Sequence, residues 1–242
     1  MGFKHSHYDY SVFTQQKGSD LVVILVYVDD LLVTRTNLKL IEQMRKDLQV
    51  RFKMKDLGDL KYFLGIEFSR SEKGIQMCQR KYALELVSEL GLSGGKPVTT
   101  PLKFNHKLTS MEFDKIVNKN GSDIDSELED KGRYQRIVGR LLYLTMTRPD
   151  IAFMVQVLSQ FMHAPKQSRM SDAVRIIKYI KGTSDLGLFM PAGGNMKLTA
   201  YYDSDWGACV KTRRSVTGYV IKFGEALISW IKEARNSLHK LS

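Results

Sequence analysis

The sequence has little cysteine and no long apolar segment. Only two cysteines, Cys78 and Cys209, occur in 242 residues, and they form no CxxC pair. This pattern implies neither a disulfide framework nor a zinc site, and it fits a reducing compartment. The amino terminus lacks the hydrophobic segment of a signal peptide. The longest apolar runs are too short to span a bilayer, so we expect no membrane partner.

Acidic residues are also in the minority. The chain has 26 Asp and Glu against 37 Lys and Arg, which gives a net charge of +11 and a pI near 9.5. Such an excess favours a polyanionic partner, nucleic acid first, because each phosphate contact releases counterions. A generally basic surface that serves solubility is the alternative. With 43% hydrophobic and 26% charged residues, the composition is that of a globular protein.

The most informative stretch is LVVILVYVDDLLVT, from Leu21 to Thr34. Two β-branched apolar runs without helical spacing flank two aspartates, which predicts a buried β-hairpin with Asp29 and Asp30 at its tip. At 5 Å and an effective dielectric of 20, the two carboxylates repel by roughly 3 kcal/mol. A divalent cation such as Mg²⁺ would offset that repulsion. The alternative is that the pair only ends a strand in solvent.

The first third of the chain contains further periodic segments. Apolar residues at three- and four-residue spacing predict helices over Asn37 to Val50 and over Gln79 to Leu90, the second ending at Gly91. Alternation predicts a strand over Tyr62 to Phe68 that pairs with Ile75 to Cys78. A short strand around Ser11 to Gln15 is expected to pair with the strand that begins at Leu21.

The rest of the chain divides into a linker, helices and strands. Residues 93–133 are polar, with glycine and proline breaks, and are interpreted as a linker. Apolar spacing then predicts three helices, which begin near Tyr134, Pro149 and Ser171. Strands are expected beyond Gly182, at 186–190, 198–202, 218–223 and 227–230. Together these elements define an α+β fold class.

Five ordered segments resemble one family. LVYVDDLLVT, FKMKDLGDLKYFLGIEF, QRKYALELVSELGL, YQRIVGRLLYLTMTRPDIAF and YYDSDWGACVKTRRSVTGYV are similar to successive parts of the Pol polyprotein of copia-type long-terminal-repeat retrotransposons. The resemblance extends from about Gly2 to Trp230. It implies a partial reverse transcriptase palm with thumb, a helical connection, and the opening β-strands of a ribonuclease H-like domain.

The resemblance implies specific site residues. Asp29 and Asp30 match the metal-binding pair of the polymerase, with Mg²⁺ or alternatively Mn²⁺ as the ion, and Asp29 is expected to be the direct ligand. Asp203 matches a metal-binding carboxylate of ribonuclease H. The residues expected to contact nucleic acid are those that shape the catalytic hairpin and those of the primer-grip hairpin: Tyr27, Val28, Tyr62, Phe63, Leu64 and Gly65. The implied partners are an RNA template, a DNA primer and, in the intact parent, a deoxynucleoside triphosphate.

The resemblance also divides the chain. Residues 1–92 match the later part of the palm and the start of the thumb, 93–133 a linker, 134–184 the connection, and 185–242 a truncated ribonuclease H-like domain. The TRPDI string is assigned a structural role, as a tight helix junction with an Arg148 to Asp150 ion pair. The family's particles would place the intact parent in the cytoplasm.

The departures from the family pattern decide the functional expectation. The palm's other metal-binding aspartate lies upstream in the family, and the tail after Trp230 lacks the expected SSAEAEY-like segment, as a frameshift would produce. We therefore expect the isolated chain to be inactive. One alternative is a non-catalytic nucleic-acid-binding remnant. Another is a different palm enzyme such as a nucleotidyl cyclase, against which the TRPDI and YYDSDWG segments argue.

Overall fold

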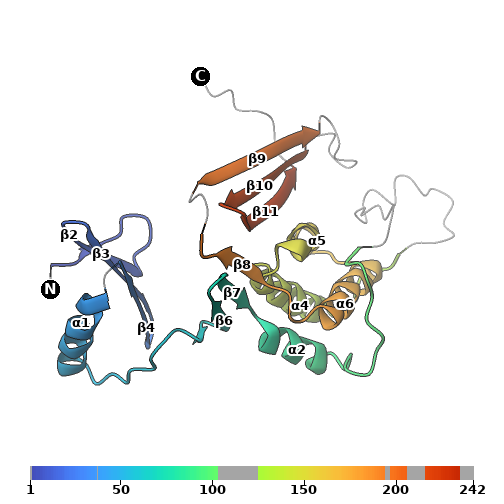
Figure 1. Ribbon diagram of the computed structural model, residues 1–242. Coiled ribbons are helices and arrows are strands. Elements are labelled where there is room, and N and C mark those ends of the chain that lie inside the picture. The colour runs from blue at the N-terminus through green and yellow to red at the C-terminus, as the bar shows by residue number, and fades with distance from the viewer. Residues whose placement is uncertain (1, 37, 103–124, 194–196, 206–215, 235–242) are drawn as a thin grey trace. The chain divides into compact units, whose positions relative to one another are not determined.

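The computed structural model describes residues 2–36, 38–102, 125–193, 197–205 and 216–234. The described residues form five helices and eleven strands (Figure 1). They belong to two compact units, Met1–Leu64 and Gly65–Ser242. Within the described residues, no helix combines the length and the apolar character needed to cross a membrane.

The first unit is built on one antiparallel sheet. Its strands follow chain order: β1 (Lys4–His5), β2 (Val12–Lys17), β3 (Asp20–Tyr27) and β4 (Asp30–Arg35). Val22 and Ile24, two positions apart on β3, are buried, as the period of a strand with one covered face requires. The predicted hairpin is thus confirmed, and so is the strand that precedes it.

Helix α1 (Leu38–Arg51) follows the sheet and confirms the predicted helix. Asn37, the first residue of the predicted helix, lies outside the described residues. The unit ends with the two-residue strand β5 (Tyr62–Phe63).

The second unit contains a helical core. Its helices are α2 (Arg80–Glu89), α4 (Lys131–Leu144), α5 (Pro149–Ser159) and α6 (Gln167–Gly182). All four contribute to one cluster of buried apolar side chains, among them Leu86, Leu141, Val155 and Ile176. Burying one such side chain stabilises a fold by about 1.5–3 kcal/mol, so this cluster is the main stabilising feature of the unit. The predicted helices are confirmed.

Helix α6 begins earlier than the sequence predicts. Ser171, near which the helix is predicted to begin, lies one turn inside it, where its hydroxyl donates to the Gln167 carbonyl oxygen four residues earlier. A serine inside a helix can make this bond to the preceding turn, so the residue type alone does not fix where the helix begins. The residue at the observed N-cap is Lys166, whose side chain makes no capping bond.

The predicted continuous strand from Tyr62 to Phe68 is wrong. The chain turns at Leu64 and Gly65, whose φ angles are +49° and +73°, and β6 (Ile66–Ser71) begins only after this turn. Glycine adopts such an angle without steric cost, whereas leucine does not. The sequence does not reveal the turn, because the alternation of side chains continues on both sides of Leu64 and Gly65.

A second sheet joins distant parts of the unit. Strand β6 pairs with β7 (Gly74–Cys78), and β7 pairs with β8 (Leu188–Pro191), both antiparallel. Strand β8 was predicted together with the strands that follow it, but it instead extends the β6–β7 hairpin, more than one hundred residues upstream.

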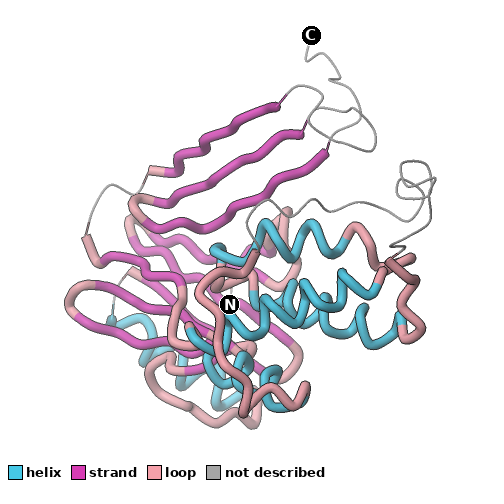
Figure 2. Tube along the Cα trace, turned by 90° about the vertical axis from the view of Figure 1, so that its right-hand side faces the viewer, coloured by secondary structure: helices cyan, strands magenta, loops and turns pink. Residues whose placement is uncertain are grey.

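The third sheet contains the last three strands. Its order is β11 (Ala226–Ala234), β10 (Val216–Phe223) and β9 (Leu198–Asp205), and all pairs are antiparallel. The three strands lie side by side in both views (Figures 1 and 2). This arrangement confirms the predicted strands and places Asp203 near the end of β9, opposite Gly218 of β10.

Candidate active site and nucleic-acid interface

The turn of the β3–β4 hairpin consists of Val28 and Asp29. Tyr27 pairs with Asp30 across the ladder, so Asp30 is the first residue of β4 rather than part of the tip. The prediction that both aspartates lie at the tip is therefore wrong for Asp30. Nevertheless, the carboxylates remain adjacent and exposed, as do the side chains of Tyr27 and Val28.

Val28 adopts a strained backbone conformation. Its φ angle is +49°, in the left-handed region, which costs a non-glycine residue about 1–2 kcal/mol and is least tolerated by β-branched side chains. Two-residue hairpin turns require positive φ angles and normally use asparagine or glycine there. The side chain of Val28 is 82% exposed, so packing does not compensate for this strain. Strain of this kind clusters at functional sites.

The two aspartates fit part of a divalent-cation site. They supply hard carboxylate oxygens, which Mg²⁺ prefers, and their exposure leaves room for water and phosphate ligands. Within the part of the chain that the structure describes, no three His, Cys, Asp or Glu side chains converge on one point. Asp29 and Asp30 therefore offer two adjacent carboxylates at this end of the hairpin.

The other sequence-predicted site residues lie in separate places. Asp203 is exposed on β9 in the second unit, whereas the side chain of neighbouring Asp205 lies outside the described residues. Tyr62 is 58% exposed, while Phe63, Leu64 and Gly65 are half-buried around the turn. Asp29 and Asp30 were predicted for one reaction and Asp203 for another, so the prediction does not require the three carboxylates to meet.

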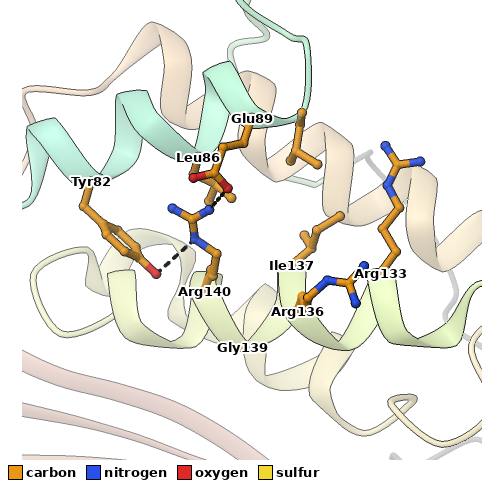
Figure 3. A pocket seen from close by; sticks show the side chains of 9 residues that line it. Tyr82, Leu86, Glu89, Arg133, Arg136, Ile137, Gly139 and Arg140 are labelled. Atoms are coloured by element: carbon orange, nitrogen blue, oxygen red, sulfur yellow. Dashed lines mark hydrogen bonds and ion pairs between the residues drawn. The ribbon is translucent and has the colours of Figure 1, made fainter.

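A groove between α2 and α4 was not predicted. It has a volume of about 640 Å³ and an apolar floor that includes Leu86 and Ile137. Figure 3 shows the basic wall, where Arg133, Arg136 and Arg140 lie along α4. Their three- and four-residue spacing places them on one helix face. That spacing was visible in the sequence, but the groove depends on two helices about fifty residues apart in the chain.

Arg140 is held in a fixed position within the groove. Its Nε donates to the Tyr82 hydroxyl at 3.3 Å, and its guanidinium lies 4.9 Å from the centroid of the Tyr82 ring. It also forms an ion pair with Glu89 of α2 (Figure 3). Partial burial lowers the pKa of Arg140, but the bonds to Tyr82 and Glu89 outweigh it and raise the pKa. Arg140 therefore stays charged, while Arg133 and Arg136 are exposed to solvent.

The TRPDI junction has the structural character that the sequence predicted. Arg148, only 2% exposed, donates to both carboxylate oxygens of Asp150 at 2.8 and 2.7 Å. It also donates to the carbonyl oxygen and the hydroxyl of Thr183, both at 2.9 Å. The Tyr179 hydroxyl donates to Asp150 at 3.0 Å. This network joins the start of α5 to the end of α6, and the predicted ion pair is confirmed.

Comparison with known proteins gives consistent matches. Residues 1–104 match the family described as reverse transcriptase (RNA-dependent DNA polymerase). The whole chain is 37% identical to the retrovirus-related Pol polyprotein from transposon RE1 of Arabidopsis thaliana, and it covers 16% of that protein. The chain is also 34% identical to an uncharacterized mitochondrial protein of Arabidopsis thaliana; the match covers 90% of this chain and 86% of that protein. It is also 30% identical to a putative transposon Ty5-1 protein of Saccharomyces cerevisiae, over 95% of this chain and 71% of that protein.

No solved structure matches the chain. The paired aspartates on a β-hairpin and the matching sequence family define a reverse transcriptase domain. Within that class, the chain belongs to the copia-type retrotransposon Pol polyproteins. It spans about one sixth of the length of the Pol polyproteins from transposons RE1 and RE2. The resemblance found in the sequence is thus confirmed.

Proposed function

We propose that this chain contributes the metal-binding hairpin of an RNA-directed DNA polymerase. Asp29 and Asp30 act as carboxylate ligands for Mg²⁺, or for Mn²⁺, with Asp29 as the direct ligand. One observation carries this assignment: adjacent exposed carboxylates follow a β-branched residue held at positive φ in a two-residue turn. A turn that served only to reverse the chain would not need either unfavourable feature.

Each neighbouring residue has a role in the proposed site. A bound divalent ion would stabilise the negative charge that develops on the phosphoryl group during its transfer. Tyr27 and Val28, exposed at the hairpin end, shape the surface under the primer terminus. Residues 62–65 contact the primer. The RNA template, DNA primer and deoxynucleoside triphosphate are substrates of the complete polyprotein, whose particles would lie in the cytoplasm.

The remaining assignments follow the family order. We assign residues 1–92 to the palm and the start of the thumb, 93–133 to a linker, 134–184 to the connection and 185–242 to the ribonuclease H-like part. In that part Asp203 is the proposed carboxylate ligand of the nuclease metal site, and its exposed position on β9 is compatible with this role.

Calorimetric titration of the purified chain with Mg²⁺ and Mn²⁺ tests the hairpin assignment. We expect saturable binding that is lost in the Asp29→Asn, Asp30→Asn double variant. The matched control is Asp56→Asn, Asp59→Asn, which removes the same charge from exposed positions in the same unit and should bind like the parent. Equal binding by all three proteins, or no binding by the parent, would contradict the assignment.

We expect no primer extension by the isolated chain, because two-metal chemistry needs carboxylates from more than one strand. The assay uses a homopolymer RNA template with a DNA primer. A template-dependent, Mg²⁺-dependent product that disappears in Asp29→Asn would overturn the expected inactivity and would support the role of Asp29.

A second candidate function is nucleic-acid binding without catalysis, and the groove between α2 and α4 favours it. Arg133 and Arg136, exposed on the same helix face as Arg140, suit neighbouring phosphates of a nucleic-acid backbone. Gly139 supports close approach, because it is exposed in the middle of α4 with no atom within 4 Å of an added Cβ. A helix-interior glycine costs about 1 kcal/mol relative to alanine. Approach of a ligand backbone would explain its presence.

Duplex binding measured by fluorescence anisotropy at several salt concentrations tests this second function. Arg133→Ala, Arg136→Ala should weaken binding and reduce the logarithmic salt slope by about 2, one for each lost phosphate contact. Arg51→Ala, Arg70→Ala removes two exposed arginines elsewhere and should change the slope less. Gly139→Ala should weaken binding although it stabilises the helix. Equal slopes for the two arginine pairs would contradict a role for the groove.

A further inference from the structure

The turn at Gly65 lies against a side chain of α4. A Cβ added to Gly65 would lie 2.9 Å from the Tyr143 hydroxyl oxygen, and 3.5 and 3.6 Å from Cε1 and Cζ of the same ring. Real Cβ atoms essentially never approach an atom as closely as the first of these distances. The hydroxyl end of Tyr143 therefore occupies the space that a side chain at position 65 would need.

Tyr143 itself packs against an aromatic side chain of α2. Its ring packs edge-on against Tyr82 of α2, with 5.1 Å between centroids and an interplanar angle of 74°. Tyr82 in turn lies under the guanidinium of Arg140, which forms the ion pair with Glu89 (Figure 3). Aromatic pairs of this geometry contribute stability beyond their burial. A series of contacts thus runs from the turn through Tyr143, Tyr82 and Arg140 to Glu89, and the ring that the turn contacts is packed against Tyr82.

We propose that Tyr143 is a positioning residue that fixes the backbone of the turn at Gly65. The contact between Tyr143 and Gly65 stands on the geometry alone. Its functional consequence rests on the proposed function, in which residues 62–65 contact the primer. Tyr143 acts through the turn, by keeping the primer-contacting backbone in one conformation. A glycine is then required at position 65 for two reasons: the φ angle is positive, and Tyr143 fills the space that a side chain would need.

A double-mutant cycle with hydrogen exchange tests the contact. Gly65→Ala introduces both a backbone penalty and a collision with the Tyr143 hydroxyl, so amides of residues 65–68 should exchange at least tenfold faster. Tyr143→Phe removes the colliding oxygen and leaves ring atoms at ordinary contact distances. The double variant should therefore recover the part of the protection that the collision removed, while the backbone penalty remains. Tyr143→Ala, which removes the ring, should accelerate exchange of residues 65–68 while leaving β10 and β11 unchanged.

Gly91→Ala is the matched control. Gly91 also has a positive φ, +67°, but an added Cβ there has no atom within 4 Å. This substitution imposes the backbone penalty without a collision, and Tyr143→Phe should not reverse its effect on exchange. Equal exchange at residues 65–68 in Gly65→Ala and in the double variant would overturn the proposal. A Gly65→Ala variant that exchanges like the parent would also overturn it, because Tyr143 would then not be fixed.

A second readout links the contact to the primer. A DNA primer carrying 2-aminopurine at its 3′ end, annealed to RNA, reports the surroundings of the primer terminus. Tyr143→Ala should reduce the fluorescence change on binding at least threefold while altering the duplex Kd less than twofold; Tyr143→Phe should retain the change. If the parent does not bind the duplex, the primer role is refuted, and the exchange cycle still decides whether Tyr143 positions the turn.

Discussion

Replacing Asp150 by asparagine should destabilise the helical part of the second unit. Asp150 accepts two hydrogen bonds from Arg148 and one from Tyr179. Asparagine has nearly the same shape but no charge, and its amide offers one acceptor oxygen in place of two. Arg148 would then keep its bonds to Thr183 but would lose the counter-ion for a guanidinium that is almost fully buried.

The expected magnitude follows from the burial of the two partners. Leaving one member of a buried ion pair without its partner costs about 3–5 kcal/mol. The Arg148 side chain is 2% exposed and that of Asp150 is 33% exposed, so water already screens one side of the pair. The two remaining bonds to Thr183 reduce the cost further. We therefore expect a loss at the lower end of that range, about 3 kcal/mol.

Urea denaturation of the full chain, followed by circular dichroism at 222 nm, measures this loss because most described helices belong to the second unit. The matched control is Glu225→Gln. Glu225 forms an exposed ion pair with Lys222 at 3.1 Å, and such pairs contribute less than about 1 kcal/mol. If Asp150→Asn lowers the free energy of unfolding no more than Glu225→Gln does, the structural role assigned to the TRPDI junction is wrong.

Three further predictions concern stability. Burial raises the pKa of Asp150, but the hydrogen bonds and charge of Arg148, together with the Tyr179 hydrogen bond, lower it by more. The stability that ionised Asp150 contributes should therefore be present above about pH 4 and be lost as pH falls through the lowered pKa. Asp150→Asn should accordingly flatten the acid limb of the plot of unfolding free energy against pH. Tyr134→Phe removes the buried bond to the Leu158 carbonyl and should cost about 1–3 kcal/mol in urea. Val28→Asn should slow exchange in the hairpin by stabilising it about 1 kcal/mol.

Local sequence signals predicted most of the secondary structure. The β-branched run before Asp29 and the apolar spacing in α4 depend on neighbours within one element, and both elements form as expected. Pro149 marks the start of α5 because proline fits the first turn of a helix. The ion pair between Arg148 and Asp150 could also be predicted, since the two residues are only two positions apart.

The features that were missed depend on pairing between distant residues. The position of the hairpin turn is set by the register of β3 and β4, in which Tyr27 pairs with Asp30, and two adjacent polar residues do not reveal that register. Strand β8 pairs with β7 across more than one hundred residues. Likewise, arginines along α4 resemble an ordinary solvated face until α2 is placed opposite them.

The candidate polymerase site has two energetically unfavourable features, the repulsion between two carboxylates and the positive φ of Val28, and each is offset in a different way. A divalent cation would offset the repulsion between Asp29 and Asp30, because it interacts with both carboxylates. It would not relieve the positive φ of Val28, which arises from clashes within the residue's own backbone and Cβ. The hydrogen-bonded ladder on both sides of the turn must therefore hold Val28 in place. The turn geometry is then a property of the hairpin before any ion binds, and metal affinity measures only the carboxylates.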